Sequence, residues 1–109
     1  GSFDFVFDKL TFKTQTSVTN EAPALASTTD PLVRDIYKVG LNTLKECMQT
    51  VYEDGPKRDR RLWIGDLYLE ALANAHTFKN HELTKHCLYL LAAFANDEGL
   101  LHATLLEKP

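Results

Sequence analysis

Apolar residues recur at helical spacing over most of the chain that follows residue 30. In the first such stretch they are three or four positions apart: Val33, Ile36, Tyr37, Leu41, Leu44, Met48 and Val51. This spacing predicts a helix from about residue 31 to residue 52. Asp30 followed by Pro31 is typical of a helix start, and Gly55-Pro56 is expected to end the helix.

Two more helices are predicted, over residues 61–77 and 81–95, with Asn80 as the cap of the later one. Short connections make consecutive helices antiparallel, so we expect helical hairpins. The helix over 61–77 is apolar nearly all round: Leu62, Ile64, Leu67, Tyr68, Leu69, Ala71, Leu72 and Ala73. A helix of this kind needs neighbours on every side. We therefore expect the chain to be part of something larger, or to pack on another chain.

The start of the chain follows a different pattern. Residues 3–18, FDFVFDKLTFKTQTSV, are rich in Phe, Val and Thr and partly alternate apolar with polar, which predicts one or two strands. Residues 19–29 are small and polar and are expected to form a linker. Residues 100–109 are expected to be extended. The predicted fold class is mainly α, with antiparallel helical hairpins preceded by one or two β-strands.

Composition narrows the classes of function. The 109 residues have a net charge of −3, which favours no nucleic acid partner, and no apolar run reaches the roughly 20 residues that cross a bilayer. The KRDRR run at 57–61 could contact phosphates, but acidic residues beside it weaken that reading. We therefore expect neither a nucleic acid nor a membrane partner.

The cysteines and histidines do not indicate a cofactor. Cys47 and Cys87 lie in apolar helical patterns, which favours buried thiols and leaves a disulfide as the alternative, so the compartment stays open. His76, His81 and His86 are five residues apart, whereas ligands on one helix face are three or four apart. No Gly-rich phosphate loop is present. We expect no metal and no cofactor.

The stretch DGPKRDRRLWIGD, residues 54–66, carries the candidate chemistry. If the helix already begins near Asp59, then Asp59, Trp63, Asp66 and Glu70 fall within roughly 60° of one another on a helical wheel. Carboxylates in apolar surroundings retain their protons to higher pH, as a general acid must, and an aromatic face packs on a sugar ring. The alternative is a solvated, salt-bridged turn followed by a helix with surface acids.

The same stretch resembles the catalytic segment of α-L-rhamnosidase-like glycoside hydrolases, whose pattern is close to D-x-P-x-R-[ED]-x-x-G-W-x-G-D. Seven positions of this sequence match it without a gap: Asp54, Pro56, Arg58, Asp59, Trp63, Gly65 and Asp66. The resemblance is strong over these thirteen residues and looser over 30–95. Two positions depart from the usual pattern: Asp59 stands where Glu is usual, and Leu62 stands where Gly precedes the Trp.

The resemblance implies a fold and roles for individual residues. In that family a β-sandwich precedes an α/α toroid of six hairpins, so residues 1–28 would end the sandwich and its linker, and 29–109 would begin the toroid. Asp59 would be the general acid. The substrate-binding residues would be Asp54, Arg58, Trp63 and Asp66.

The resemblance also implies the reaction and the partners. The substrate would be a rhamnoside-type carbohydrate, hydrolysed with inversion, and the rest of the toroid would pack on this chain. The general base would come from a part of the protein that follows residue 109. The alternative function is a non-catalytic helical module that packs on a partner chain.

Overall fold

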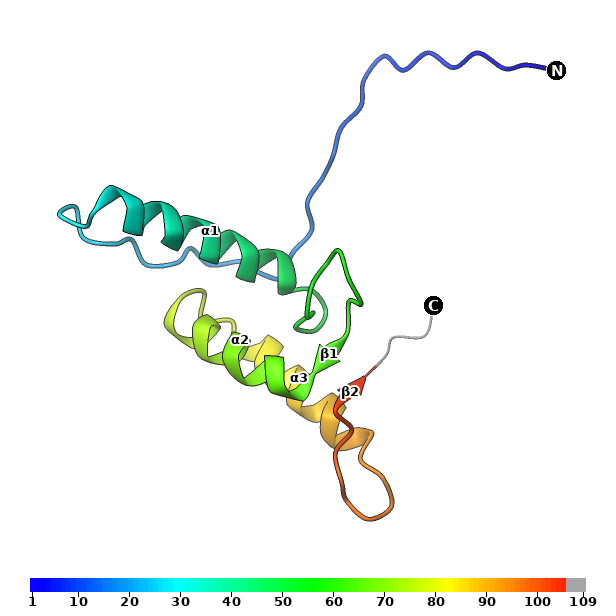
Figure 1. The fold of residues 1–109 in the computed structure, drawn as a ribbon. Helices are drawn as coiled ribbons and strands as arrows, with labels where there is room; N and C mark the ends of the chain where they lie inside the picture. The colour runs from blue at the N-terminus through cyan, green and yellow to red at the C-terminus, as the bar shows by residue number, and fades with distance from the viewer. Residues whose placement is uncertain (106–109) are drawn as a thin grey trace.

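A computed structural model of the protein describes residues 1–105. Along the chain the elements are α1 (Pro31–Cys47), β1 (Leu62–Trp63), α2 (Ile64–His76), α3 (His81–Ala93) and β2 (Thr104–Leu105) (Figure 1). The two strands pair antiparallel, with Leu62 opposite Leu105 and Trp63 opposite Thr104. The mainly helical fold class is confirmed. Over residues 1–105 no helix is both long and apolar enough to cross a membrane.

The predicted helix starts are confirmed at both capped positions. Asp30 Oδ1 accepts a hydrogen bond from the N–H of Leu32 at 2.8 Å, and Pro31 follows it as the first helical residue. Asn80 accepts from the N–H of Leu83 at 3.3 Å and opens α3. Each cap satisfies an N–H that has no partner inside its helix, so these local signals are enough to fix the two starts.

Helix α1 ends at Cys47, so the predicted end near residue 52 is wrong. The backbone turns back on itself: Gln49 N–H donates to Val51 O at 3.0 Å, and Glu53 N–H donates to Cys47 O at 2.9 Å. This turn buries Met48, Val51 and Tyr52 in the core. The periodic apolar pattern therefore identified Met48 and Val51 as buried, but tertiary packing buries them through a turn instead of through more helix, and the pattern residues Val33 and Ile36 are exposed.

Helix α2 begins at Ile64, so the predicted start near residue 61 is also wrong. The two residues before it form β1, and the N–H of Ile64 itself donates to Ala103 O at 2.9 Å. Pairing with a distant part of the chain keeps Leu62 and Trp63 extended. The helical face that we predicted for Asp59, Trp63, Asp66 and Glu70 does not exist, because only Asp66 and Glu70 lie on the helix.

The core lies between α2, α3 and the turn that follows α1. It consists of Met48, Val51, Tyr52, Leu62, Leu67, Phe78, Leu83, Cys87 and Leu91. Cys47 and Cys87 are both free and buried, as the buried-thiol interpretation predicts, and no disulfide joins them in this structure. The backbone N–H of Tyr52 contacts the Cys87 sulfur at 3.4 Å, so this thiol is part of the packing between the turn and α3.

Asn74 organises the connection between α2 and α3. Its side chain is 0% exposed and makes three hydrogen bonds: Nδ2 donates to Tyr52 Oη at 2.6 Å and to Asn80 O at 2.9 Å, and Oδ1 accepts from Asn80 N–H at 3.0 Å. Its backbone oxygen accepts from the N–H groups of Thr77 and Lys79. One amide therefore joins the end of α2, the start of α3 and the turn after α1.

The same connection contains a residue in an unfavourable conformation. Lys79 is exposed and has φ = 56°, in the left-handed region that only glycine enters without cost. Lys79→Gly should raise the free energy of unfolding by about 0.5–1 kcal/mol, because it removes this cost and keeps the N–H that bonds to Asn74. Denaturant unfolding measures the change. Lys79→Ala removes the same charge without relieving the backbone, so a stabilisation of equal size in that variant would contradict the explanation.

The N-terminal segment differs from the prediction. Residues 3–18 form no strand in the structure, and the first part of the chain runs away from the helices (Figure 1). Its apolar side chains, Phe3, Phe5, Phe7 and Phe12 among them, are exposed. Strands need a partner for their backbone hydrogen bonds, and no segment of residues 1–105 pairs with this one. Whether it ends a β-sandwich stays a prediction.

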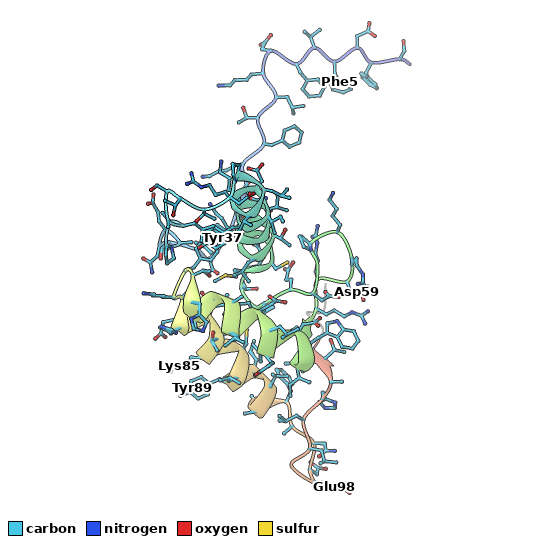
Figure 2. All side chains as sticks on the ribbon, turned by 60° about the vertical axis from the view of Figure 1, so that its left-hand side comes forward. Phe5, Tyr37, Asp59, Lys85, Tyr89 and Glu98 are labelled. Atoms are coloured by element: carbon cyan, nitrogen blue, oxygen red, sulfur yellow. The ribbon has the colours of Figure 1, made fainter. Side chains whose placement is uncertain are left out.

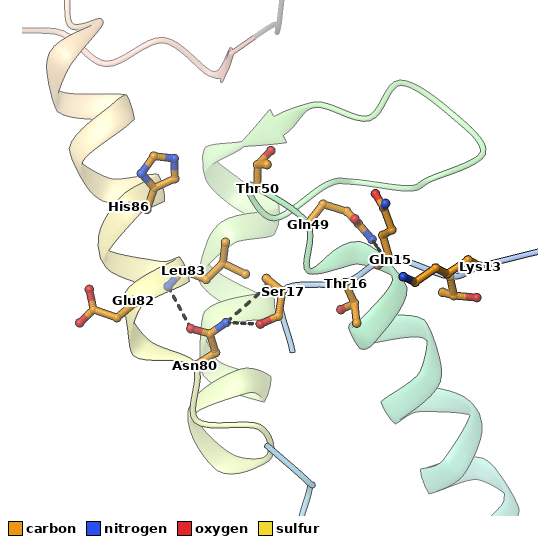
Figure 3. A pocket seen from close by; sticks show the side chains of 11 residues that line it. Lys13, Gln15, Thr16, Ser17, Gln49, Thr50, Asn80, Glu82, Leu83 and His86 are labelled. Carbon is orange, nitrogen blue, oxygen red and sulfur yellow. Dashed lines mark hydrogen bonds between the residues drawn. The ribbon is translucent and has the colours of Figure 1, made fainter. Parts of the chain in front are cut away.

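The chain before α1 is attached to the helices at several points: Asn20 Nδ2 donates to Phe78 O at 3.2 Å, and Tyr37 Oη donates to Pro23 O at 2.7 Å. Ser17 N–H donates to Met48 O at 2.8 Å, and Asn80 Nδ2 donates to Ser17 O at 3.1 Å (Figure 3). Thr16 Oγ1 donates to Lys45 O at 2.8 Å. These bonds fix the chain across the end of α1 and the start of α3.

Large apolar side chains are exposed on all three helices. They include Leu32, Ile36 and Val39 on α1, Tyr68, Leu69 and Leu72 on α2, and Leu88 and Tyr89 on α3. The radius of gyration is 18.2 Å, whereas a compact chain of about 100 residues has one of roughly 13 Å. Monomeric soluble proteins rarely expose large apolar side chains to this extent.

Candidate active site

The segment between α1 and β1 is a tight loop closed at its base by Asp54 and Arg61. Asp54 N–H donates to Arg61 O at 3.1 Å, and Asp54 Oδ1 accepts from Arg61 N–H at 3.0 Å. Inside the loop Arg58 N–H donates to Gly55 O at 3.0 Å, and Arg60 Nε donates to Pro56 O at 2.9 Å. Arg60 has φ = 53°, which turns the chain back towards β1. These contacts give the loop a defined shape beside the helices.

The predicted site residues lie at different levels of this loop. Arg58 and Asp59 are exposed on its outer part, where Figure 2 shows Asp59 projecting beside the helices. Asp54 is half-buried at its base, and Trp63 is half-buried on β1. Asp66 is exposed in the first turn of α2, where the helix dipole stabilises a negative charge. The apolar surroundings that we predicted for Asp59 are not supplied by residues 1–105.

The structure brings Asp54 and Asp66 together around a third acid, Glu70. The pKa of Glu70 is raised to about 8, mainly by burial and then by the nearby charges of Asp66, Asp54 and Glu53, in that order. Asp59 is not among the groups that act on Glu70. The predicted residues therefore separate into two acids whose charges act on Glu70, Asp54 and Asp66, and one whose charge does not, Asp59.

The acidic groups around Glu70 also affect the pKa of the buried Cys47 thiol. Its pKa is raised to about 11, mainly by burial and then by the nearby charges of Glu70, Glu53 and Asp54. Cys47 ends α1, so the acids surround the point where α1, the loop and α2 meet. Over residues 1–105, no group of three or more His, Cys, Asp or Glu side chains is arranged to hold a metal ion.

The helical-wheel prediction includes Glu70 on the acidic face but implies no role for it. Its spacing, four residues after Asp66, was the available signal, because side chains four apart on a helix are neighbours. Its burial was not visible in the sequence, since it depends on how residues 53 and 54 fold back onto α2.

Two hollows in the described part of the chain are not lined by the candidate site residues together. One, of about 740 Å³, is shown in Figure 3 and is lined by residues 13–17, by Gln49 and Thr50, and by Asn80 and the first turns of α3. Its Asn80 and Ser17 side chains already bond to protein groups. A smaller hollow of about 220 Å³ lies beside the acidic loop and is lined by Gln49, Glu53, Pro56 and Arg60. Neither of these hollows is lined by Asp54, Arg58, Asp59, Trp63 or Asp66.

Comparison with known proteins connects this acidic loop and its helical hairpin to one family. Residues 22–105 match the family described as the bacterial alpha-L-rhamnosidase six-hairpin glycosidase domain. The chain therefore carries part of a glycoside hydrolase domain. It belongs to the bacterial alpha-L-rhamnosidase six-hairpin glycosidase family.

A solved structure supports the same assignment. The chain is similar to a rhamnosidase from Klebsiella oxytoca with rhamnose bound, at 50% sequence identity and a TM-score of 0.79 over 86% of this chain. The match spans only 18% of the length of the Klebsiella chain. No match is found among curated protein sequences.

Proposed function

We propose that this chain supplies the first helices of the catalytic domain of an α-L-rhamnosidase, which hydrolyses rhamnose-type glycosides with inversion. The observation that carries the proposal is the acidic loop, whose residues 54–66 place Asp54 and Asp66 around one point at the start of α2. Membership of the family and the likeness to a rhamnosidase with rhamnose bound support it.

Each side chain has a role that its position allows. Asp54 and Asp66 accept hydrogen bonds from sugar hydroxyls, and Trp63 packs against the apolar face of the ring. Asp59, exposed on the outer part of the loop, reaches the glycosidic oxygen and protonates it as the bond breaks. Arg58, next to Asp59, supports the pocket.

The remainder of the site comes from further protein. In an inverting hydrolase a second carboxylate activates water on the opposite face of the sugar, roughly 6.5–9.5 Å from the acid. The exposed apolar faces of α1, α2 and α3 pack on the rest of the toroid, which also encloses Asp59. Residues 1–28 join this domain to a preceding β-sandwich.

The test is the stereochemistry of hydrolysis by a protein that extends over the length of the Klebsiella chain. Proton NMR of an aryl α-L-rhamnoside during the first minutes of reaction should show β-L-rhamnose as the first product, followed by slow mutarotation. Initial release of the α-anomer would contradict inversion. Absence of any rhamnoside hydrolysis would contradict the enzyme.

The exposed apolar helix faces also fit the second candidate, a non-catalytic helical module that packs on a partner chain. One experiment distinguishes the two candidate functions. Binding of L-rhamnose that is lost in Asp66→Asn favours the enzyme, whereas association with a partner that is unaffected by this substitution favours the module.

A further inference from the structure

Glu70 contains a buried polar atom that the proposed function leaves unused. Glu70 lies on α2, one turn after Asp66 and on the same face of the helix. Its Oε2 atom is buried and has no hydrogen-bond partner among residues 1–105. Buried side-chain oxygens are bonded in the large majority of cases, so this one calls for a physical explanation.

The groups around Glu70 determine whether its carboxyl group is protonated or ionised. Titratable groups from every neighbouring element interact with its charge: Cys47 at the end of α1, Tyr52, Glu53 and Asp54 in the following segment, Asp66 on α2 and Cys87 on α3. All of them are acids or neutral groups that become negative. The three carboxylates near Glu70 favour the protonated form of its buried carboxyl group.

We propose that Glu70 is a positioning residue for the sugar-binding carboxylates: it keeps its proton and donates its O–H to Asp54 or Asp66, so that both stay ionised and aimed at substrate hydroxyls. This inference rests on the proposed function. A neutral Glu70 supplies a donor without adding charge. An ionised Glu70 would force a proton onto one of its neighbours, or rotate that neighbour away, and a sugar-binding acceptor would be lost.

The effect should therefore be on substrate binding, and it has a defined direction with pH. Burial and the neighbouring carboxylates together raise the pKa of Glu70 to about 8, so binding is intact below that pH and weakens as the pH rises through it. With one proton controlling affinity, KM should rise about tenfold for each pH unit above this point.

Glu70→Gln in the intact protein tests the proposal, because Gln has the same size, carries N–H donors and cannot ionise. The substrate is an aryl α-L-rhamnoside with an acidic leaving group, which needs no proton from Asp59. The wild-type KM should rise between pH 8 and pH 9, whereas that of Glu70→Gln should stay within about twofold. Glu82→Gln changes an exposed glutamate in the first turn of α3 and should behave as wild type.

Two results would overturn the proposal. One is an alkaline rise of KM in Glu70→Gln equal to that of wild type. The other is a large rise of KM in this variant already at pH 6, which would show that the negative charge of Glu70 is needed.

The protonation state of Glu70 can be measured independently of activity. Infrared difference spectra at pH 7 should show the C=O stretch of a protonated carboxylic acid in wild type that is missing in Glu70→Gln. Absence of the band in wild type would overturn the inference. A protein that shows the band but hydrolyses no rhamnoside would instead contradict the proposed function.

Discussion

Asp59→Asn should lower turnover of a natural rhamnoside by about 10²–10⁴-fold in the intact enzyme, because the leaving sugar or aglycone then departs without a proton. The loss should be much smaller, within about tenfold, with an aryl rhamnoside whose leaving group is already acidic. Steady-state kcat/KM for the two substrates measures the contrast. Asp97→Asn, an exposed aspartate after α3, serves as the control and should leave both values unchanged.

The neighbouring acids should give a different pattern. Asp54→Asn and Asp66→Asn should reduce kcat/KM for both substrates by similar factors, because these residues hold the sugar and do not serve the leaving group. Equal losses on the two substrates in Asp59→Asn would remove Asp59 from the role of general acid. Full activity in all three variants would count against the whole assignment of the loop.

Local sequence signals were enough to predict where α1 and α3 begin. The Asp30-Pro31 pair and Asn80 opened helices where expected, because a cap needs only the residues that follow it. The end of α1 and the start of α2 were missed, because both depend on distant contacts. Trp63 pairs with Thr104, and no propensity within residues 60–65 contains that information.

The identity of the candidate site residues stays a prediction, and their predicted geometry is only partly right. The spacing of residues 54–66 selected Asp54, Arg58, Asp59, Trp63 and Asp66 through a resemblance that the family match supports. Their placement on one helical face was wrong, because the loop closed by Asp54 and Arg61 carries Asp59 outward. The importance of Glu70 follows from this loop geometry, since its burial arises where the loop folds against α2.

Replacing the buried amide of Asn74 should cause a large loss of stability. Asn74→Ala removes three hydrogen bonds and leaves the N–H and C=O of Asn80, together with the Tyr52 hydroxyl, short of partners in the core. Each lost bond contributes about 1 kcal/mol, and unpaired buried groups add to the cost, so the loss should be about 3 kcal/mol or more.

Hydrogen exchange of the α2 and α3 amides measures this loss locally, within a larger protein. Protection factors in both helices should fall together by about 100-fold, which corresponds to roughly 3 kcal/mol. Asn96→Ala is the matched control: Asn96 also accepts two backbone bonds, from Glu98 and Leu100, but it is exposed and should change protection by less than about tenfold. Tyr52→Phe should give an intermediate loss, because it deprives Asn74 and Thr84 of one partner each. Unchanged protection in Asn74→Ala would show that the hairpin is held by its apolar contacts alone, and that the amide only fills space between the turn after α1 and the start of α3.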